Sequence, residues 1–429
     1  MSELKPREGQ EGGVLVISLL LLMGLTALGA AFMTTSRTEV QISGNVVTYA
    51  QALSHAEAGL NEAVARLAVP LSPHYIAEDM TAPNPGWGRY IVLERGNSTQ
   101  DPDFGKTATD GLDNDLDAAT DETSESYPEV LSVQSNFHHP LAYPWVKVNY
   151  RLDGANNIVR YGDHDNNRAT APRRNPTFGQ PIVTVTARGE QGPANRTLEV
   201  DLVRPPSFDI RACMYTEDDD FSFSGDDFFI SGQDFDPATG DTVSNSTRLP
   251  AIVTTADLAK LLGQIGHQQG DQIIGSGGES DVQVAPENLN LEWYVDTWGR
   301  LADFHYVGDT NNPDNTNVWG DFDNYCVVYV EDGDMTLKGE NTGGGLLLVD
   351  GNLKVAGSFT WYGVVIALGD IYFKGGGDLE GQFHIYGGVF ANGVNLNTVT
   401  GNADILYSSE AIDRLKNLRG VLPLSWKER

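Results

Sequence analysis

The chain has 429 residues and a formal net charge of −31 at pH 7, which is long enough for two or three domains with sizeable cores. A chain this acidic repels phosphates, so the composition argues against nucleic acid as a partner. Its two cysteines, Cys213 and Cys326, are too few for a zinc site and are compatible with one disulfide in an oxidising compartment.

The N-terminus begins with a short polar leader and continues as an uncharged apolar run, residues 14–33. A membrane-spanning helix needs about 20 apolar residues, whereas the apolar core of a cleaved secretory signal has ~7–15. Downstream, apolar residues recur three or four positions apart until Pro70 ends the pattern. The sequence therefore predicts one helix from about Val14 to Leu67, apolar all round at first and then amphipathic. At the α-helical rise its length would be on the order of 80 Å.

Three motifs lie along this predicted helix: Gly13 at the end of the leader, Thr35 followed by Gly44-Asn45, and HAEAGLNEA at 55–63. In combination they resemble the N-terminus of the PilX-like minor pilins of type IV pili, the PilX N-terminal domain family. The resemblance covers residues 1–65 and implies cleavage by a prepilin peptidase after Gly13, or after Gly12. Val14 would then be the new N-terminus.

The same resemblance implies partners and a location. The partners would be other pilins and pilus-assembly proteins, reached through the N-terminal helix. Before assembly the chain would pass once through the inner membrane, with its bulk in the periplasm or outside the cell as part of a pilus.

Ser18 stands at the fifth position of the mature chain, where major pilins carry a glutamate. That carboxylate meets the N-terminal ammonium of a neighbouring subunit, because an unpaired carboxylate in a membrane is costly. A subunit with nothing above it has no ammonium to meet, so Ser18 favours a tip or initiating subunit. The alternative is a serine that is merely tolerated in a membrane helix, including the helix of a non-pilin anchor.

Residues 70–205 contain short stretches in which apolar and polar side chains alternate, as they do in half-buried strands. These stretches are 88–94, 144–153, 157–162, 181–191 and 196–204. The last two predict a hairpin around Gly189–Asn195. We expect a small antiparallel sheet like a pilin head, joined by the stiff Pro205-Pro206 to the next domain.

The loop DGLDNDLDAATDE at 110–122 alternates carboxylates in a way that lets a loop wrap one hard cation. The candidate calcium ligands are Asp113, Asp115, Asp117 and Asp121. Ala118 and Ser124 stand where an EF-hand needs glycine and glutamate, so the looser thrombospondin-type loops are more similar. A solvated acidic loop is the alternative. The loop at 163–167 repeats the spacing with Asp163, Asp165 and Asn167 and fewer charges.

Glycines recur every six residues from Gly333 to Gly393, and the second and fourth positions of most units are apolar. Each unit predicts a short strand with two inward side chains and a glycine corner. Three units form a rung of eighteen residues, which indicates a triangular β-solenoid over 206–408. The weak units at 340–345 and 376–381 predict local bulges or loops.

Similar units at 220–225 and 227–232 indicate that the solenoid starts near residue 207 and is interrupted by an insertion at 236–325. Cys213 and Cys326 would then occupy equivalent places on stacked rungs, which favours a disulfide between them.

Three further helices are expected. Two lie in the insertion, at 254–266 with Thr254 as N-cap and at 286–304. The third lies at 407–420 and begins at Ser408 or Ser409. Within 409–429 we expect this helix, covering the open edge of the last rung, and then a tail.

The sequence contains no nucleophile elbow, zinc-protease, P-loop or dinucleotide motif, so we expect no enzyme. A polysaccharide-active solenoid would need paired carboxylates or a basic residue on its outer face. The candidates for such pairs are Asp218, Asp219, Asp226, Asp227, and Asp370 with His384.

The expected fold class is α+β, with a stalk helix, a small antiparallel sheet and a mainly-β solenoid. The expected function is a minor pilin-like structural subunit of a type IV pilus or a type II secretion pseudopilus, at its tip or initiating it. The alternatives are a membrane-anchored β-solenoid scaffold that never enters a filament, and a surface polysaccharide-active enzyme.

Overall fold

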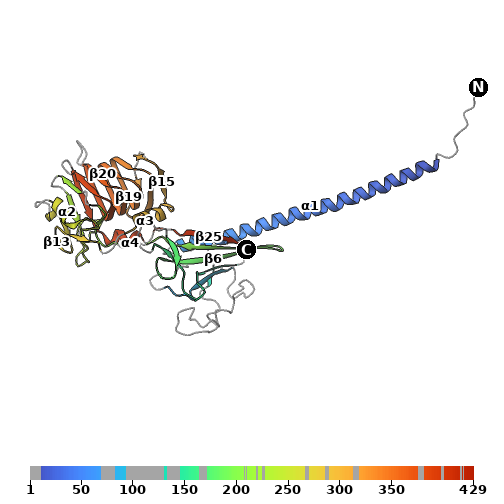
Figure 1. Ribbon diagram of the computed structural model, residues 1–429, viewed down its shortest axis with the longest axis horizontal. Helices are drawn as coiled ribbons and strands as arrows, with labels where there is room; N and C mark the ends of the chain where they lie inside the picture. The colour runs from blue at the N-terminus through green and yellow to red at the C-terminus, as the bar shows by residue number, and fades with distance from the viewer. Residues whose placement is uncertain are drawn as a thin grey trace, which may run out of the picture.

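The chain forms one long N-terminal helix followed by a mostly-β part with two sheets, which agrees with the predicted α+β class (Figure 1). The structure is a computed structural model. It describes residues 11–68, 83–92, 130–132, 145–163, 172–206, 208, 210–218, 221–224, 228–265, 270–285, 289–312, 318–374, 381–397, 401–415, 418 and 420–429.

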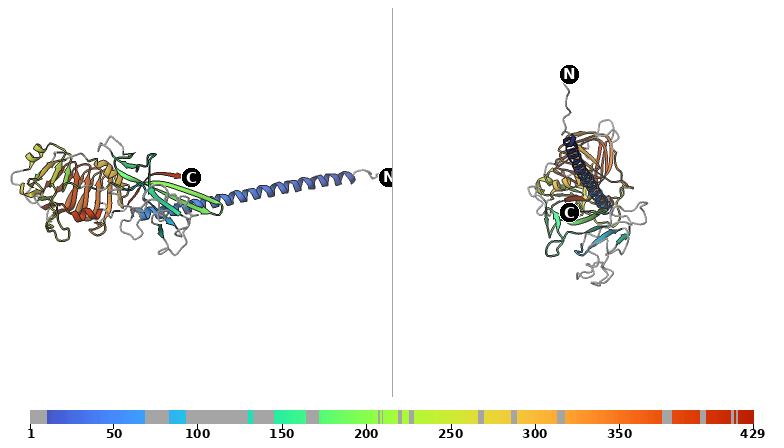
Figure 2. Two further views of the ribbon diagram at one scale, coloured as in Figure 1. Left: turned by 90° about the horizontal axis from the view of Figure 1, so that it is seen from below. Right: turned by 90° about the vertical axis from the view of Figure 1, so that its right-hand side faces the viewer.

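The N-terminal helix, α1 (Glu11–Ala68), has 58 residues and confirms the single helix predicted over 14–67. Its first half projects away from both sheets along the long axis of the molecule (Figures 1 and 2). Its second half packs against β6 (Gln180–Gln191) and β7 (Ala194–Val203). Burial of α1 begins at Ala52, so the exposed part of the helix extends well beyond the apolar run at 14–33.

Small residues allow α1 to lie close to this sheet. Ala52 and Ala56 are fully buried, and Gly189 of β6 faces them. A Cβ on Gly189 would overlap the carbonyl oxygen of Ala52, so only glycine permits this approach. Nearby, Nδ1 of His55 lies 2.8 Å from the carbonyl oxygen of Glu190.

The first sheet runs in the order β2-β1-β3-β6-β4-β5, and β7 pairs with both β6 and β25. Strands β1, β3, β4, β6 and β7 confirm the five stretches predicted as strands, and β6 and β7 form the predicted hairpin. The remaining bounds are β1 (Gly88–Val92), β2 (Val130–Ser132), β3 (Trp145–Tyr150), β4 (Arg160–Gly162), β5 (Arg173–Asn175) and β25 (Leu422–Glu428).

The C-terminal strand β25 corrects the tail expected at the end of 409–429, because it pairs antiparallel with β7 of the first sheet. This pairing brings Ser425 of β25 into hydrogen-bond contact with a buried carboxylate on β7. Asp201 is 3 % exposed and accepts hydrogen bonds from Thr184 (2.8 Å) and from Ser425 of β25 (2.9 Å). Arg174 lies 2.9 Å from Oδ2 of Asp201, the oxygen that also accepts from Ser425. A buried carboxylate is tolerated when it is paired in this way.

The second sheet has 17 strands and makes up the C-terminal β-domain. Among the described strand pairs whose register is known, the pairings are parallel except for β12–β13. The strands are β8 (Met214–Thr216), β9 (Phe221–Ser224), β10 (Phe228–Ser231), β11 (Ile252–Thr254), β12 (Ile273–Gly275), β13 (Gly278–Glu279), β14 (Val282–Val284), β15 (Phe304–Val307), β16 (Thr310–Asn311), β17 (Val318–Trp319), β18 (Cys326–Glu331), β19 (Met335–Val349), β20 (Leu353–Ala367), β21 (Ile371–Lys374), β22 (Gly381–Ala391), β23 (Val394–Asn397) and β24 (Gly401–Leu406).

Strands β19 and β20 pair in parallel along their whole length. Met335 lies opposite Leu353 and Val349 opposite Ala367, so the offset is 18 residues throughout. From β20 to β22 the offset is 24 residues. The bulge expected at 340–345 is absent from the described chain, because this segment pairs in register inside β19. Most of the other weak unit, 376–380, lies outside the described residues.

Glycines stack where these strands bend. Gly357, Gly363 and Gly387 have φ angles of 138°, 124° and 147°, which residues other than glycine rarely adopt. A Cβ on Gly363 would also overlap the carbonyl oxygen of Gly345 in the preceding strand. The backbones therefore approach closely at these corners only because no side chain is present.

The order of strands corrects the predicted insertion at 236–325. Strands β8, β9 and β10 pair with β22, β23 and β24, and β11 and β12 continue the sheet from β8 and β10. At the opposite end of the sheet, β15 to β17 pair with β18 and β19. The supposed insertion thus extends the sheet at both of its ends.

The helices of the β-domain are shorter than predicted. They are α2 (Leu258–Gln264), α3 (Leu291–Gly299) and α4 (Ser409–Arg414), with a 3₁₀ turn at Gly270–Gln272. Asp257 caps α2 instead of Thr254, which belongs to β11, whereas Ser408 caps α4 as predicted. The capping role of α4 was wrong, because β24 is paired with both β22 and β10 and α4 contacts β20 and β22.

The β-domain has one core between its strands and a second on one outer face. The first contains Phe359, Trp361 and Phe383. The second contains Leu346 and Ile366 and is covered by α3. This helix therefore lies along the outer side of the strands and faces the first sheet, which places it at the junction of the two domains (Figure 1).

Candidate functional site

The exposed half of α1 is the first candidate site. From Val14 to Met33 every large apolar side chain is more than half exposed. Among the described residues there is one helix that is long and apolar enough to cross a membrane. Gly13 and Val14 lie exposed in the first turns of this helix. Cleavage between them stays a prediction.

The hydroxyl groups of this helix find their partners within it. Ser18 Oγ donates to the carbonyl oxygen of Leu15 at 2.9 Å, and Thr26 donates to that of Leu22 at 2.8 Å. Lipid offers no water to a polar group, so this bonding suits an apolar environment. The proton of Ser18 therefore needs no acceptor from another chain, and its assembly role stays a prediction.

A second apolar stretch lies nearer the first sheet. It consists of Val40, Ile42, Val46, Val47 and Tyr49, which we call the membrane-distal band. These side chains are 46–69 % exposed. A narrow polar stripe of Gln41, Asn45 and Thr48 interrupts it.

The membrane-distal band lies too far along α1 to share a bilayer with the N-terminal run. A hydrocarbon core of ~30 Å is crossed by about 20 helical residues. A bilayer that covers Val14–Met33 would therefore leave the band outside. The band ends where the first sheet begins to contact α1, with the Arg196 guanidinium 4.7 Å from the centre of the Tyr49 ring. No other described segment covers it.

The predicted calcium ligands Asp113, Asp115, Asp117 and Asp121 lie outside the described residues, as do Asp165 and Asn167. Asp163 is described, and its Oδ2 accepts a hydrogen bond of 2.6 Å from Asn290. Within the described part of the chain, no three His, Cys, Asp or Glu side chains form a group able to hold a metal ion. Calcium binding by 110–122 therefore stays a prediction.

That prediction has a direct test. A cation held only by the folded chain adds stability, about 2.7 kcal/mol at 100 times its Kd. Chelation should therefore lower the melting temperature of the wild-type chain, and an Asp115→Ala/Asp117→Ala variant should melt at the lower temperature with or without chelator. An unchanged wild-type melting temperature after chelation would contradict calcium binding.

The two described members of the predicted pair Asp370 and His384 each contact other side chains. Asp370 accepts from Tyr372 (2.8 Å) and Asn392 (3.2 Å), whereas His384 lies 3.0 Å from Asp404. Asp218 is described, but Asp219, Asp226 and Asp227 are not.

The predicted disulfide is absent, since Cys213 and Cys326 are both free and buried. The path from β18 to β8 runs through β19, β20 and β22, which are four successive pairings. At ~4.8 Å per pairing the two cysteines are about 19 Å apart, whereas a disulfide needs Cα atoms within ~7 Å. The sulfhydryl of Cys213 instead donates to the carbonyl oxygen of Ile405 (3.2 Å), and burial raises the pKa of both thiols.

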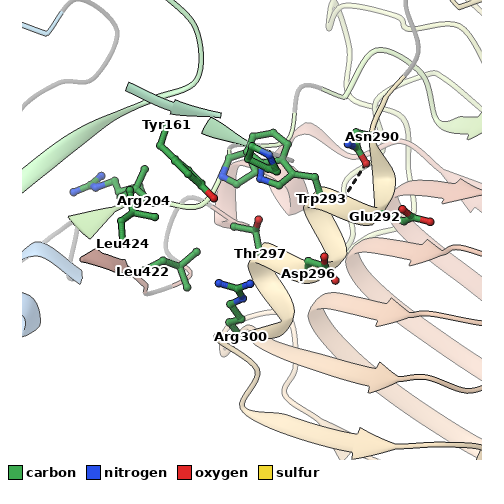
Figure 3. Close-up of a pocket in the computed structure, with 13 residues that line it drawn as sticks. Tyr161, Arg204, Asn290, Glu292, Trp293, Asp296, Thr297, Arg300, Leu422 and Leu424 are labelled. Atoms are coloured by element: carbon green, nitrogen blue, oxygen red, sulfur yellow. Dashed lines mark hydrogen bonds between the residues drawn. The ribbon is translucent and has the colours of Figure 1, made fainter. Parts of the chain in front are cut away.

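A second candidate site, which the sequence did not reveal, is a cleft of about 330 Å³ between the two domains (Figure 3). We call it the junction cleft. Its walls come from segments far apart in the sequence, namely β4, β7, α3 and β25. It is lined by Tyr161, Pro172, Val203, Arg204, Pro206, Asn290, Glu292, Trp293, Asp296, Thr297, Arg300, Leu422 and Leu424.

Comparison with solved structures finds a distant likeness to the competence-associated pilin ComZ from Thermus thermophilus. The identity is 12 %, the TM-score is 0.19, and the match covers 66 % of this chain and 86 % of that chain. No protein-family model matches the sequence, and neither does any curated protein. A likeness of this size leaves the fold and the function to be argued from the chain itself.

Proposed function

We propose that the chain is a minor pilin-like structural subunit, whose N-terminal helix enters a type IV pilus or a type II secretion pseudopilus. The observation that carries this proposal is the membrane-distal band. Five large apolar side chains on an exposed helix outside the bilayer would cost free energy in water. Packing against the helices of neighbouring subunits would remove them from water, whereas a plain membrane anchor gives them no cover.

The proposal includes a tip or initiating position for the subunit, with the C-terminal β-domain displayed outside the membrane. Ser18 supports this position because its hydroxyl group is bonded within its own helix and needs no ammonium group from a neighbouring subunit. The 18-residue offset between β19 and β20 supports a β-solenoid as the displayed domain. The predicted partners are other pilins, pilus-assembly proteins and a prepilin peptidase. We propose no enzymatic activity.

The decisive experiment is N-terminal sequencing of the protein from cells with and without a prepilin peptidase. We expect the mature chain to begin at Val14 only when the peptidase is present. A Gly13→Ala variant should keep its leader and be lost from the assembled fraction, while an Arg7→Ala variant in the same leader should mature normally. A native chain that keeps Met1 and stays in the membrane would instead identify an anchored scaffold.

A further inference from the structure

The junction cleft has two chemically different walls (Figure 3). Helix α3 supplies Trp293 and Thr297, together with the charged side chains Glu292, Asp296 and Arg300. The facing wall belongs to the first sheet and supplies Tyr161, Arg204, Leu422 and Leu424. In Figure 3 the hydroxyl groups of Tyr161 and Thr297 both point into the space between the walls.

Both walls are held in place before any ligand arrives. Asn290 caps α3 by accepting from the backbone N–H of Trp293 (3.1 Å), and it donates to Asp163 at 2.6 Å. The indole N–H of Trp298 donates to the carbonyl oxygen of Pro206, at 3.1 Å. On the other wall Arg204 donates to the carbonyl oxygen of Leu67, at 3.2 Å. A preformed cleft loses little entropy on binding, which is typical of small-molecule sites.

The charges of the cleft argue against an ionic ligand. An anion would meet Glu292 and Asp296. Partial desolvation and the nearby Asp350 carboxylate already raise the pKa of Asp296, although Arg300 opposes this. A metal ion would be repelled by Arg300, and the described residues contain no metal-binding group of three side chains.

The backbone of the cleft argues against a peptide that adds a strand. Strand β7 is paired on both sides, with β6 and β25, and β4 is paired with β5 and β6. Tyr161 and Arg204 therefore stand on or next to strands whose edges are already occupied. Among the described strands β25 pairs with β7 alone, but between Leu422 and Leu424 it has Pro423, which has no N–H to donate. A ligand in this cleft is therefore recognised mainly by side chains.

What remains is a neutral ligand rich in hydroxyl groups. We propose that the junction cleft binds a neutral saccharide. The flat faces of Trp293 and Tyr161 offer packing surface to the C–H faces of a sugar ring. Asp296 accepts hydrogen bonds from its hydroxyl groups, and Arg300 and the hydroxyl groups of Tyr161 and Thr297 donate to its oxygens. A volume of about 330 Å³ is at the small end of ligand sites and suits one or two sugar rings.

The test uses the full-length chain in a detergent without a sugar headgroup, because a glycosidic detergent would compete for the cleft. Neutral mono- and disaccharides, the same sugars carrying carboxylate or sulfate, and isolated envelope polysaccharide are each titrated. Calorimetry and tryptophan fluorescence follow the binding. Comparing the affinity for mono- and disaccharides with that for envelope polysaccharide shows whether the ligand is a free saccharide or the end of an envelope glycan.

We expect saturable binding of at least one neutral saccharide, and a loss of at least ~10-fold in affinity with Trp293→Ala. Trp426→Ala is the matched control, because this tryptophan is 58 % exposed on β25 and does not line the cleft. It should leave the affinity unchanged. Trp293→Phe keeps an aromatic face and should retain most of the binding, which excludes a folding defect as the cause.

Three results would overturn the proposal: no binding of any neutral saccharide at millimolar concentration, binding of charged sugars alone, or equal affinities for the Trp293→Ala and Trp426→Ala variants. The cleft does not include the exposed half of α1. A failure of saccharide binding would therefore not contradict the proposed filament role. Likewise, a failure of filament assembly would not contradict saccharide binding by the junction cleft.

Discussion

Replacing Gly363 with alanine is expected to unfold the C-terminal β-domain at a clearly lower temperature. The new Cβ would overlap the carbonyl oxygen of Gly345, and the φ angle of 124° is strained for any residue but glycine. Strained backbone costs ~1–3 kcal/mol and overpacking costs about the same again. A total of about 4 kcal/mol would lower the melting temperature of a domain of this size by roughly 10 °C.

Gly339→Ala is the matched control for this prediction. Gly339 also has a positive φ angle, 77°, but within the described structure no atom lies within 4 Å of its added Cβ. The control should therefore lose only the free energy that a left-handed backbone costs an alanine, about 1–2 kcal/mol. Circular dichroism during thermal unfolding measures the melting temperature of each variant. Equal melting temperatures would show that stacking at the glycine corner does not limit stability.

The glycine spacing predicted local structure in the β-domain better than it predicted strand order. A corner that must lie against the backbone of its neighbour leaves a glycine in the sequence, so Gly357 and Gly363 were visible as parts of a repeat. The pairing partner of each strand leaves no such mark, because the repeated six-residue units offer similar apolar side chains. The positions of Cys213 and Cys326 in the sheet could not be inferred for this reason.

The junction between the domains was also hidden from the sequence. One signal was available: GLLLV at 345–349 and GVVIA at 363–367 are apolar without interruption, so both of their faces had to be buried. That pattern indicates an outer cover, which α3 provides. Strand β25 gave no comparable signal, since it contains Pro423, and most of its side chains are exposed. Its place is fixed by its contact with Asp201, which is distant in sequence.

Placing two lysines in the membrane-distal band is expected to stop assembly without unfolding the chain. Ile42 and Val46 lie four residues apart on one face of α1 and are 58 % and 61 % exposed. In the isolated chain, Ile42→Lys/Val46→Lys would leave both charges in water at little cost. In an apolar interface between helices each buried, unpaired lysine would cost ~3 kcal/mol. At a factor of ten for every ~1.4 kcal/mol, incorporation should fall by at least ~100-fold.

The control adds the same two charges to the same helix at the same height, as Gln41→Lys/Asn45→Lys on the polar stripe. Quantitative immunoblotting of the membrane fraction and of sheared filaments measures both double variants against the wild-type chain. We expect all three in the membrane at similar levels, and only the Ile42/Val46 variant missing from filaments. If that variant enters filaments as well as the polar-stripe control does, the band is not covered by neighbouring subunits, and the main support for a filament role is lost.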